Sequence, residues 1–385
     1  MTWIMSKLRN SSSRRSFLAA GLAMPAAKLS SAPADPPLRY RVLGKTGLKL
    51  TEVGFGCMIT SDPSVIAKAL DLGINLYDTA RVYQGGNNER MVGAALKGKR
   101  KQIILCSKSK GRTTEAALED LNTSLRELQT DYLDVWYTHN VPDLANLTEG
   151  AMEAQRIAKK QGKIRFGGIS LHSGHAEVIP AAIKTKHFDV LLVSYNFAMD
   201  KNAAAYIEQA RKAGIGTVGM KVMAGGFRRA PFYPSDDSTR GTLKREGAML
   251  AALKWVLKDK NIDTTIPSIV DMDELDENVQ AMASPFSNKD EKLLAAQLDF
   301  IRPLYCRMCG SCQGSCPKGL PVSDMVRYLS YADGYGQFAL GREHFLELPR
   351  EIQQVRCGDC SSCSVQCPNG VRVQDRLTRA QELFA

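Results

Sequence analysis

Short apolar runs alternate with helical patterns along most of this 385-residue chain. Each run has the length of a buried strand. An amphipathic helical pattern, such as 114–128 or 243–257, follows each run. Strands that alternate with helices pair in parallel, because each helix returns the chain to the same end of the sheet. The predicted strands are 53–58, 74–77, 103–107, 133–137, 164–169, 190–195, 217–222 and 264–267. Eight such units predict a (β/α)8 TIM barrel.

The segment before the first strand, 39–50, alternates apolar and polar residues around Gly44 and Gly47. This pattern predicts a hairpin that plugs the bottom of the barrel.

Four polar side chains stand at the ends of three predicted strands. Asp78 and Tyr83 follow the strand 74–77, Lys108 follows 103–107, and His139 follows 133–137. The carboxyl ends of barrel strands face the reaction site. A tyrosine has an ordinary pKa of about 10, so it donates a proton poorly near neutrality unless a cation lowers that value. We expect Lys108 to be that cation, Asp78 to hold the lysine, and His139 to orient the acceptor oxygen or share its proton.

These four residues, with the runs 43–48, 53–56 and 128–135, resemble the catalytic tetrad and signatures of the aldo/keto reductases. The resemblance covers roughly residues 39–300. It implies reduction of a small carbonyl compound, or oxidation of an alcohol, by hydride transfer with a nicotinamide cofactor.

The same resemblance implies which residues bind the nucleotide. They are Ser170, Ser268, Glu277 and Asn278. The pocket departs from the family's pattern at Leu171, where asparagine is usual, at Leu192, where glutamine is usual, and at Met220, which replaces an aromatic shelf.

The family often carries Lys and Arg at the positions of Ser268 and Glu274, where they bind a 2'-phosphate. An acid at Glu274 repels that phosphate and favours NAD over NADP, unless Lys221 or Arg228 compensates from another loop.

The composition changes after residue 300, where two cysteine runs share the spacing C-x2-C-x2-C-x3-C-P. This is the spacing of two-cluster ferredoxins, in which the fourth cysteine of each run crosses to the other cluster. The assignment is Cys306, Cys309, Cys312 and Cys367 for one 4Fe–4S cluster, and Cys357, Cys360, Cys363 and Cys316 for the second. Disulfides are the alternative in an exported chain, and zinc would leave one cysteine over in each run. Cys57 and Cys106 are expected in the core.

The cysteine runs lie in a predicted ferredoxin-like domain, residues 301–385, after a barrel domain over 35–300. Helices are expected at 289–300, 325–331 and 342–348. A terminal helix over 371–385 is expected to dock on the barrel through Val373, Leu377 and Phe384.

Residues 1–34 have the order of a twin-arginine export signal. Arg14 and Arg15 precede the apolar stretch 18–27 and the sequence Ala-Pro-Ala at 32–34. This route exports folded proteins, which suits metal clusters assembled before export and predicts a periplasmic location. The formal charge of +11 includes five basic residues of this segment, and the more balanced remainder gives no support for nucleic-acid binding. No apolar run is long enough to span a membrane.

Hydride transfer needs no metal, so the clusters require their own explanation. The favoured hypothesis links the two-electron barrel reaction to one-electron carriers through both clusters, with a redox partner protein or a quinone-linked acceptor. One alternative is a plain reductase with structural clusters. The other is a barrel without nicotinamide turnover that serves as an electron-transfer or binding platform.

Overall fold

The computed structural model describes residues 38–199, 202–226 and 246–385. Its centre is a parallel sheet of eight strands in the order β10-β9-β8-β7-β6-β5-β4-β3. Bridges from Val53 to Thr265 and from Gly56 to Ser268 join the two edge strands, so the sheet curls into a closed barrel. The strands are β3 (Phe55–Gly56), β4 (Leu76–Asp78), β5 (Ile104–Ser109), β6 (Leu133–Thr138), β7 (Ile164–Leu171), β8 (Val190–Ser194), β9 (Gly216–Met220) and β10 (Thr264–Thr265). The predicted barrel is confirmed.

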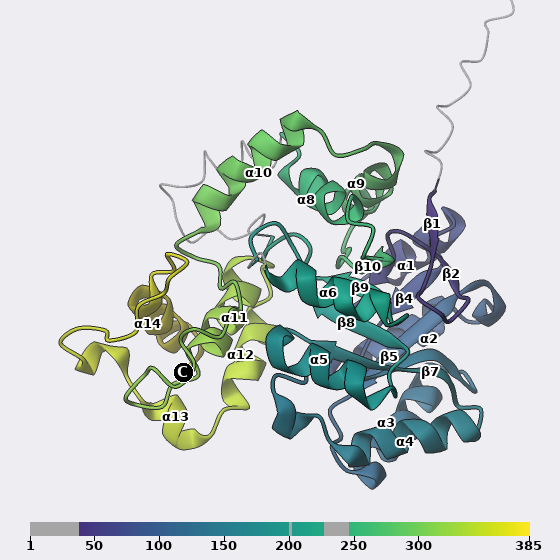
Figure 1. Ribbon diagram of the computed structural model, residues 1–385, viewed down its shortest axis with the longest axis horizontal. Helices are drawn as coiled ribbons and strands as arrows, with labels where there is room; N and C mark the ends of the chain where they lie inside the picture. Colours follow the sequence, from purple (N-terminus) through teal and green to yellow (C-terminus); the bar gives the residue numbers. More distant parts are fainter. Residues whose placement is uncertain (1–37, 200–201, 227–245) are drawn as a thin grey trace, which may run out of the picture. The chain divides into compact units, whose positions relative to one another are not determined.

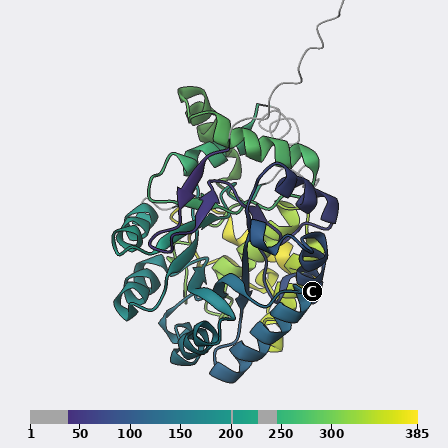
Figure 2. The same ribbon diagram turned by 90° about the vertical axis from the view of Figure 1, so that its right-hand side faces the viewer.

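Helices lie around the strands (Figures 1 and 2). They are α1 (Pro63–Asp71), α2 (Asn87–Ala95), α3 (Thr114–Glu127), α4 (Glu149–Lys160), α5 (His175–Thr185), α6 (Asn202–Lys212), α8 (Ala248–Leu257), α9 (Met272–Ala283) and α10 (Asn288–Ile301). Helix α3 shows why they form, because Thr113 caps its amino end and one face buries Ala117, Leu121 and Leu125. In the ranges that the structure describes, no helix combines the length and the apolar character needed to cross a bilayer.

The predicted plug is confirmed as a hairpin of β1 (Tyr40–Val42) and β2 (Lys49–Thr51). Leu43, Leu48 and Leu50 are buried together with inward-facing residues of the barrel strands. Gly44 has a φ of +49°, and a Cβ atom there would collide with the backbone nitrogen of Gly216. The tip of the hairpin therefore needs a glycine to reach this depth.

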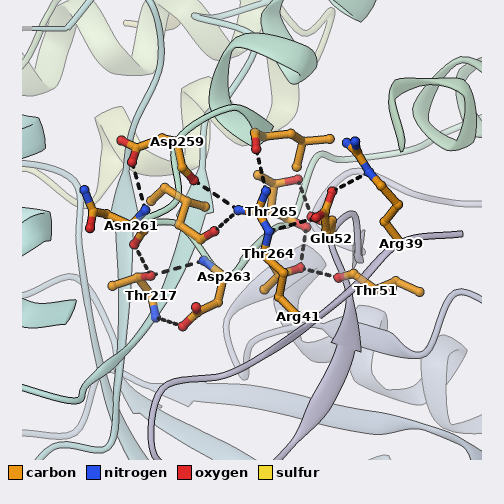
Figure 3. Close-up of polar contacts among 12 residues, drawn as sticks. Arg39, Arg41, Thr51, Glu52, Thr217, Asp259, Asn261, Asp263, Thr264 and Thr265 are labelled. Atoms are coloured by element: carbon orange, nitrogen blue, oxygen red, sulfur yellow. Dashed lines mark hydrogen bonds and ion pairs between the residues drawn. The ribbon is translucent and has the colours of Figure 1, made fainter. Parts of the chain in front are cut away.

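Polar contacts fix the hairpin to the segment between α8 and β10 (Figure 3). The guanidinium of Arg41 donates to the Leu257 carbonyl at 2.6 Å and to the Asp259 carbonyl at 3.0 Å, and pairs with Glu52. The backbone N–H of Thr265 donates to the Glu52 carbonyl at 3.0 Å. These contacts thus join the hairpin to the last strand of the barrel.

The C-terminal segment builds a core of its own. Helices α11 (Val322–Asp333), α12 (Phe338–Leu346) and α14 (Val373–Phe384) pack together beside the short α13 (Arg350–Gln354). The expectation that Val373, Leu377 and Phe384 dock on the barrel is wrong. These side chains are buried against α11 and α12, because an amphipathic pattern shows that a face is buried but not against what.

A buried ion pair joins the ends of this small core. The carboxylate of Asp333, at the end of α11, accepts from Arg376 at 2.7 Å and from Arg379 at 2.9 Å, both on α14. Asp333 is fully buried, so its charge depends on these two guanidinium groups.

We expect Leu50→Ala to lower the free energy of unfolding by about 2–5 kcal/mol, because it opens a cavity inside the barrel. Denaturant unfolding would measure the change. Val42→Ala is the matched control on the same hairpin, since Val42 is 47% exposed and should shift stability by about 0.5 kcal/mol or less. Equal effects of the two substitutions would contradict the role of the hairpin as a plug.

Candidate active site

The four residues predicted at the strand ends lie together. Asp78 ends β4, Tyr83 begins the short helix η1 (Tyr83–Gly86), Lys108 lies in β5, and His139 directly follows β6. The Lys108 ammonium pairs with Asp78 and donates to the Thr79 carbonyl at 2.7 Å and to the Tyr83 hydroxyl at 3.2 Å. The rings of Tyr83 and His139 meet edge to face, with centroids 5.8 Å apart.

The charges of Lys108 and Asp78 are buried, with side chains only 1% and 3% exposed. Burial is the largest single effect and lowers the pKa of Lys108, but Asp78 and Tyr83 together outweigh it through their charges and hydrogen bonds and raise the pKa above its ordinary value. Burial raises the pKa of Asp78, and the attraction of Lys108 opposes that rise. The lysine is therefore protonated at neutral pH, and Asp78 is its ion-pair partner.

We expected Lys108 to lower the pKa of Tyr83, but other effects raise it. Lys108 does lower it, but burial is the larger effect, and the negative charge of Asp78 acts in the same direction as burial. The pKa of Tyr83 therefore lies above its ordinary value, and the phenol is protonated at neutral pH.

His139 is neutral at the same pH. Burial, followed by the positive charges of Lys108 and Lys110, holds its pKa well below the ordinary histidine value. Its Nδ1 is buried and has no hydrogen-bond partner among the described residues. A neutral imidazole with one free nitrogen can bind the oxygen of a ligand.

Two cavities meet at Tyr83. The first, which we call the β10 chamber, has an empty volume of about 850 Å³ including space open to solvent. Its lining includes Asp78, Tyr83, His172, Met220, Ser268 and Glu274. The second, which we call the α11 chamber, measures about 580 Å³ in the same way. Its lining includes Tyr83, Lys110, His139, His172, Arg327 and Tyr331.

The β10 chamber contains part of the predicted nucleotide site. Ser268 lines it, and Glu274 lines it from α9. One turn further along α9, Asn278 is fully buried, and neither polar atom of its amide has a partner in the part of the chain that the structure describes. An amide with a free donor and a free acceptor fits the edge of a nucleobase.

The other predicted nucleotide residues are placed differently. Ser170 is buried, and its Oγ accepts the backbone N–H of Asn140 at 3.0 Å. Glu277 is half-buried on α9. Lys221, considered as a phosphate ligand, donates to the Tyr331 hydroxyl at 3.2 Å, and Arg228 lies outside the described residues.

The eight cysteines of the C-terminal domain form two groups. Cys306 lies near Cys309, Cys312 and Cys367, and Cys357 lies near Cys316, Cys360 and Cys363. Burial, helped by the neighbouring thiols, raises the pKa of Cys306 to about 12 and that of Cys357 to about 11. The fourth cysteine of each run thus lies beside the other run, and this arrangement fits the predicted clusters.

No three cysteine, histidine or acidic side chains converge on a single-ion site within residues 38–199, 202–226 and 246–385. A 4Fe–4S cluster does not need such convergence, because its four cysteines bind four different irons.

Sequence reasoning missed the residues that the C-terminal domain contributes to the α11 chamber. They are Arg327, Tyr328, Tyr331, Leu340, Glu343, His344 and Glu347. The loops 141–148 and 225–240 carry no sequence motif that indicates a substrate, and residues 227–240 lie outside the described residues. The barrel also contributes Lys110 to this chamber. Its position directly after a strand is a sequence signal that could have indicated a place in the site.

We expect Asp78→Asn to lower the free energy of unfolding by about 3–5 kcal/mol, because it leaves the Lys108 ammonium buried without a counter-charge. Denaturant unfolding would measure this. Adding Lys108→Met should recover most of the loss. Glu153→Gln is the control, since its ion pair with Arg156 is exposed and contributes about 1 kcal/mol at most. A double variant as unstable as Asp78→Asn would argue against the charge explanation.

The chain is similar to several known proteins. The chain is 27% identical to the holo structure of the aldo-keto reductase AKR11C1 from Bacillus halodurans, with a TM-score of 0.59 over 68% of this chain and 96% of that one. L-galactose dehydrogenase of Arabidopsis thaliana is 26% identical over 69% of this chain and 95% of that protein. The uncharacterized oxidoreductase YqkF of Bacillus subtilis is 32% identical, but the alignment spans only 41% of this chain and 56% of that protein.

Family models match both parts of the chain. Residues 305–376 match the model of the 4Fe-4S dicluster domain. Residues 62–298, more than half of the chain, match the model of the aldo/keto reductase family. The protein is therefore an oxidoreductase with a 4Fe–4S dicluster domain, and it belongs to the aldo/keto reductase family.

Proposed function

We propose that this enzyme reduces a small carbonyl compound, or oxidises the corresponding alcohol, with a nicotinamide cofactor at the junction of its two chambers. The observation that carries the proposal is the Tyr83 hydroxyl, which lines both chambers and accepts a hydrogen bond from the buried Lys108 ammonium. The substrate would occupy the α11 chamber, and the nucleotide would occupy the β10 chamber.

The nicotinamide, when bound, would supply or accept the hydride. Tyr83 is protonated at neutral pH and would give its proton to the carbonyl oxygen, which becomes the hydroxyl of the alcohol. Lys108 would stabilise the phenolate that remains, because its positive charge lies within hydrogen-bond distance. His139, which is neutral, would hold the carbonyl oxygen through a hydrogen bond. In the reverse direction the same residues would take the proton from the alcohol.

The nucleotide is proposed to be NAD rather than NADP. Glu274 lines the β10 chamber, and its Oε2 accepts the backbone N–H of Val270 at 3.0 Å, which holds the carboxylate at the start of α9. A 2'-phosphate beside this acid would meet a like charge.

The two clusters are proposed to exchange single electrons with a redox partner protein or a quinone-linked acceptor. The position of Cys306 supports an electron-transfer link to the barrel. Cys306 directly follows Tyr305, whose hydroxyl accepts a hydrogen bond from the Asn196 amide of the barrel at 3.0 Å. The competing explanation is that the clusters only brace the C-terminal domain. The order of residues 1–34 supports twin-arginine export to the periplasm as part of the same proposal.

Tyr83→Phe should lower turnover about 10²- to 10⁴-fold, because it removes the proton donor and little else. Carbonyl reduction with NADH would be followed by nicotinamide absorbance, and iron content would show whether the clusters remain. Turnover at the wild-type level would refute the assignment of Tyr83. An active variant lacking iron would place the clusters outside the reaction. No nucleotide-dependent turnover in the wild type would favour the binding platform.

Cys309→Ser should reduce the iron content from about eight atoms per chain and diminish dye-coupled more than nicotinamide-coupled activity. The reason is that only the dye-coupled reaction needs the clusters. Cys57→Ala is the matched control, because Cys57 is a buried thiol of the barrel and lies in neither cysteine group. Equal loss of both activities would indicate structural clusters instead.

A further inference from the structure

The C-terminal domain forms one wall of the α11 chamber. Tyr331 of α11 stands out in this wall because its hydroxyl accepts hydrogen bonds from two basic side chains. The opposite wall carries Tyr83 and His139 from the barrel. A substrate in this chamber would therefore contact the catalytic residues on one side and the cluster-binding domain on the other. Beyond the iron–sulfur clusters, the domain thus has residues in a position to recognise the substrate.

Two cations hold the Tyr331 hydroxyl in place. Lys221, which follows β9, donates to it at 3.2 Å, and Arg327, one turn earlier on α11, donates at 3.1 Å. The tyrosine oxygen is the acceptor in both hydrogen bonds. Among the described residues no acceptor binds the tyrosine's own proton, so that proton remains available to a ligand.

The charges around Tyr331 also affect whether its hydroxyl is ionised. Burial would raise its pKa, but the charges and hydrogen bonds of Lys221 and Arg327 outweigh burial and lower the pKa to about 8. A substrate hydroxyl can both donate and accept, so it can bind Tyr331 whether the phenol is protonated or ionised.

The rest of the chamber lining contains charged groups of both signs beside apolar side chains such as Leu340. Lys110 of the barrel pairs with Glu347 at 2.9 Å, and the His344 ring contacts both Glu347 and the Tyr331 ring. Glu343 also lines the chamber. Paired charges of both signs favour an uncharged compound with several hydroxyl groups over an anion.

We propose that Tyr331, held by Lys221 and Arg327, is a substrate-positioning residue that binds a hydroxyl group of a polyhydroxylated carbonyl substrate while Tyr83 acts on the carbonyl. This inference rests on the proposed function, because it assumes that Tyr83 faces the reacting group. It makes the cluster-binding domain a determinant of substrate specificity.

The test compares two aldehydes with the same carbon chain, glyceraldehyde and propanal, in the purified holoenzyme. The wild type should prefer glyceraldehyde in kcat/KM, and Tyr331→Phe should reduce the ratio of the two kcat/KM values about tenfold, mainly through KM. Tyr305→Phe is the matched control. It removes a buried hydroxyl of the same domain that bonds to Asn196, and it should keep the ratio. A ratio unchanged by Tyr331→Phe, or changed equally by both variants, would overturn the proposal.

Binding of xylitol, measured by calorimetry, separates this inference from the reaction itself. Xylitol should bind the wild type and the Tyr305→Phe variant, and bind Tyr331→Phe about tenfold more weakly. Turnover without xylitol binding would overturn the inference and leave the role of Tyr83 standing. Xylitol binding that depends on Tyr331, without turnover of either aldehyde, would support the inference and refute the proposed reaction.

Discussion

The buried ammonium of Lys108 is the constraint on which the active site depends. A charge this deep costs several kcal/mol unless a counter-charge meets it, and Asp78 is the carboxylate that does so. The two residues come from adjacent parallel strands, so the register of β4 with β5 sets their approach. Tyr83 is presented to the same ammonium by a turn in which Gln84, Gly85 and Gly86 all adopt left-handed backbone conformations. Glycine adopts this conformation freely, so the strain lies at Gln84, directly after the phenol.

Polar contacts help to hold the cluster-binding domain at the mouth of the barrel, beside an apolar cluster in which Ala198 and Ala224 meet residues 301–305. Lys221 with Tyr331 is one such contact, and Lys110 with Glu347 is another. Close backbone approach adds a steric requirement, because a side chain at Gly334 would collide with the Gly225 carbonyl. Three of these four groups, Lys110, Tyr331 and Glu347, also line the α11 chamber. The same side chains therefore hold the two domains in contact and shape the chamber beside Tyr83.

Local sequence was sufficient for the parts of this structure that follow from periodicity or spacing. The strand ends placed Asp78, Lys108 and His139 correctly near one another, because parallel strands in a barrel all point the same way. The pKa of Tyr83 was beyond such reasoning, since burial depends on the whole fold. Tyr331 was missed because nothing in the sequence says which surface of one domain meets the other. The terminal helix was predicted, but not its partner, for the same reason.

The position of α14 has a consequence for biosynthesis. Its buried residues, from Val373 to Phe384, complete the core that α11 and α12 begin. A ribosome makes α14 after α11 and α12, so α11 lacks part of its packing until α14 has been translated. The barrel strands are all translated earlier and can pair before then. The wall that α11 contributes to the α11 chamber therefore completes its packing later than the barrel wall opposite Tyr331.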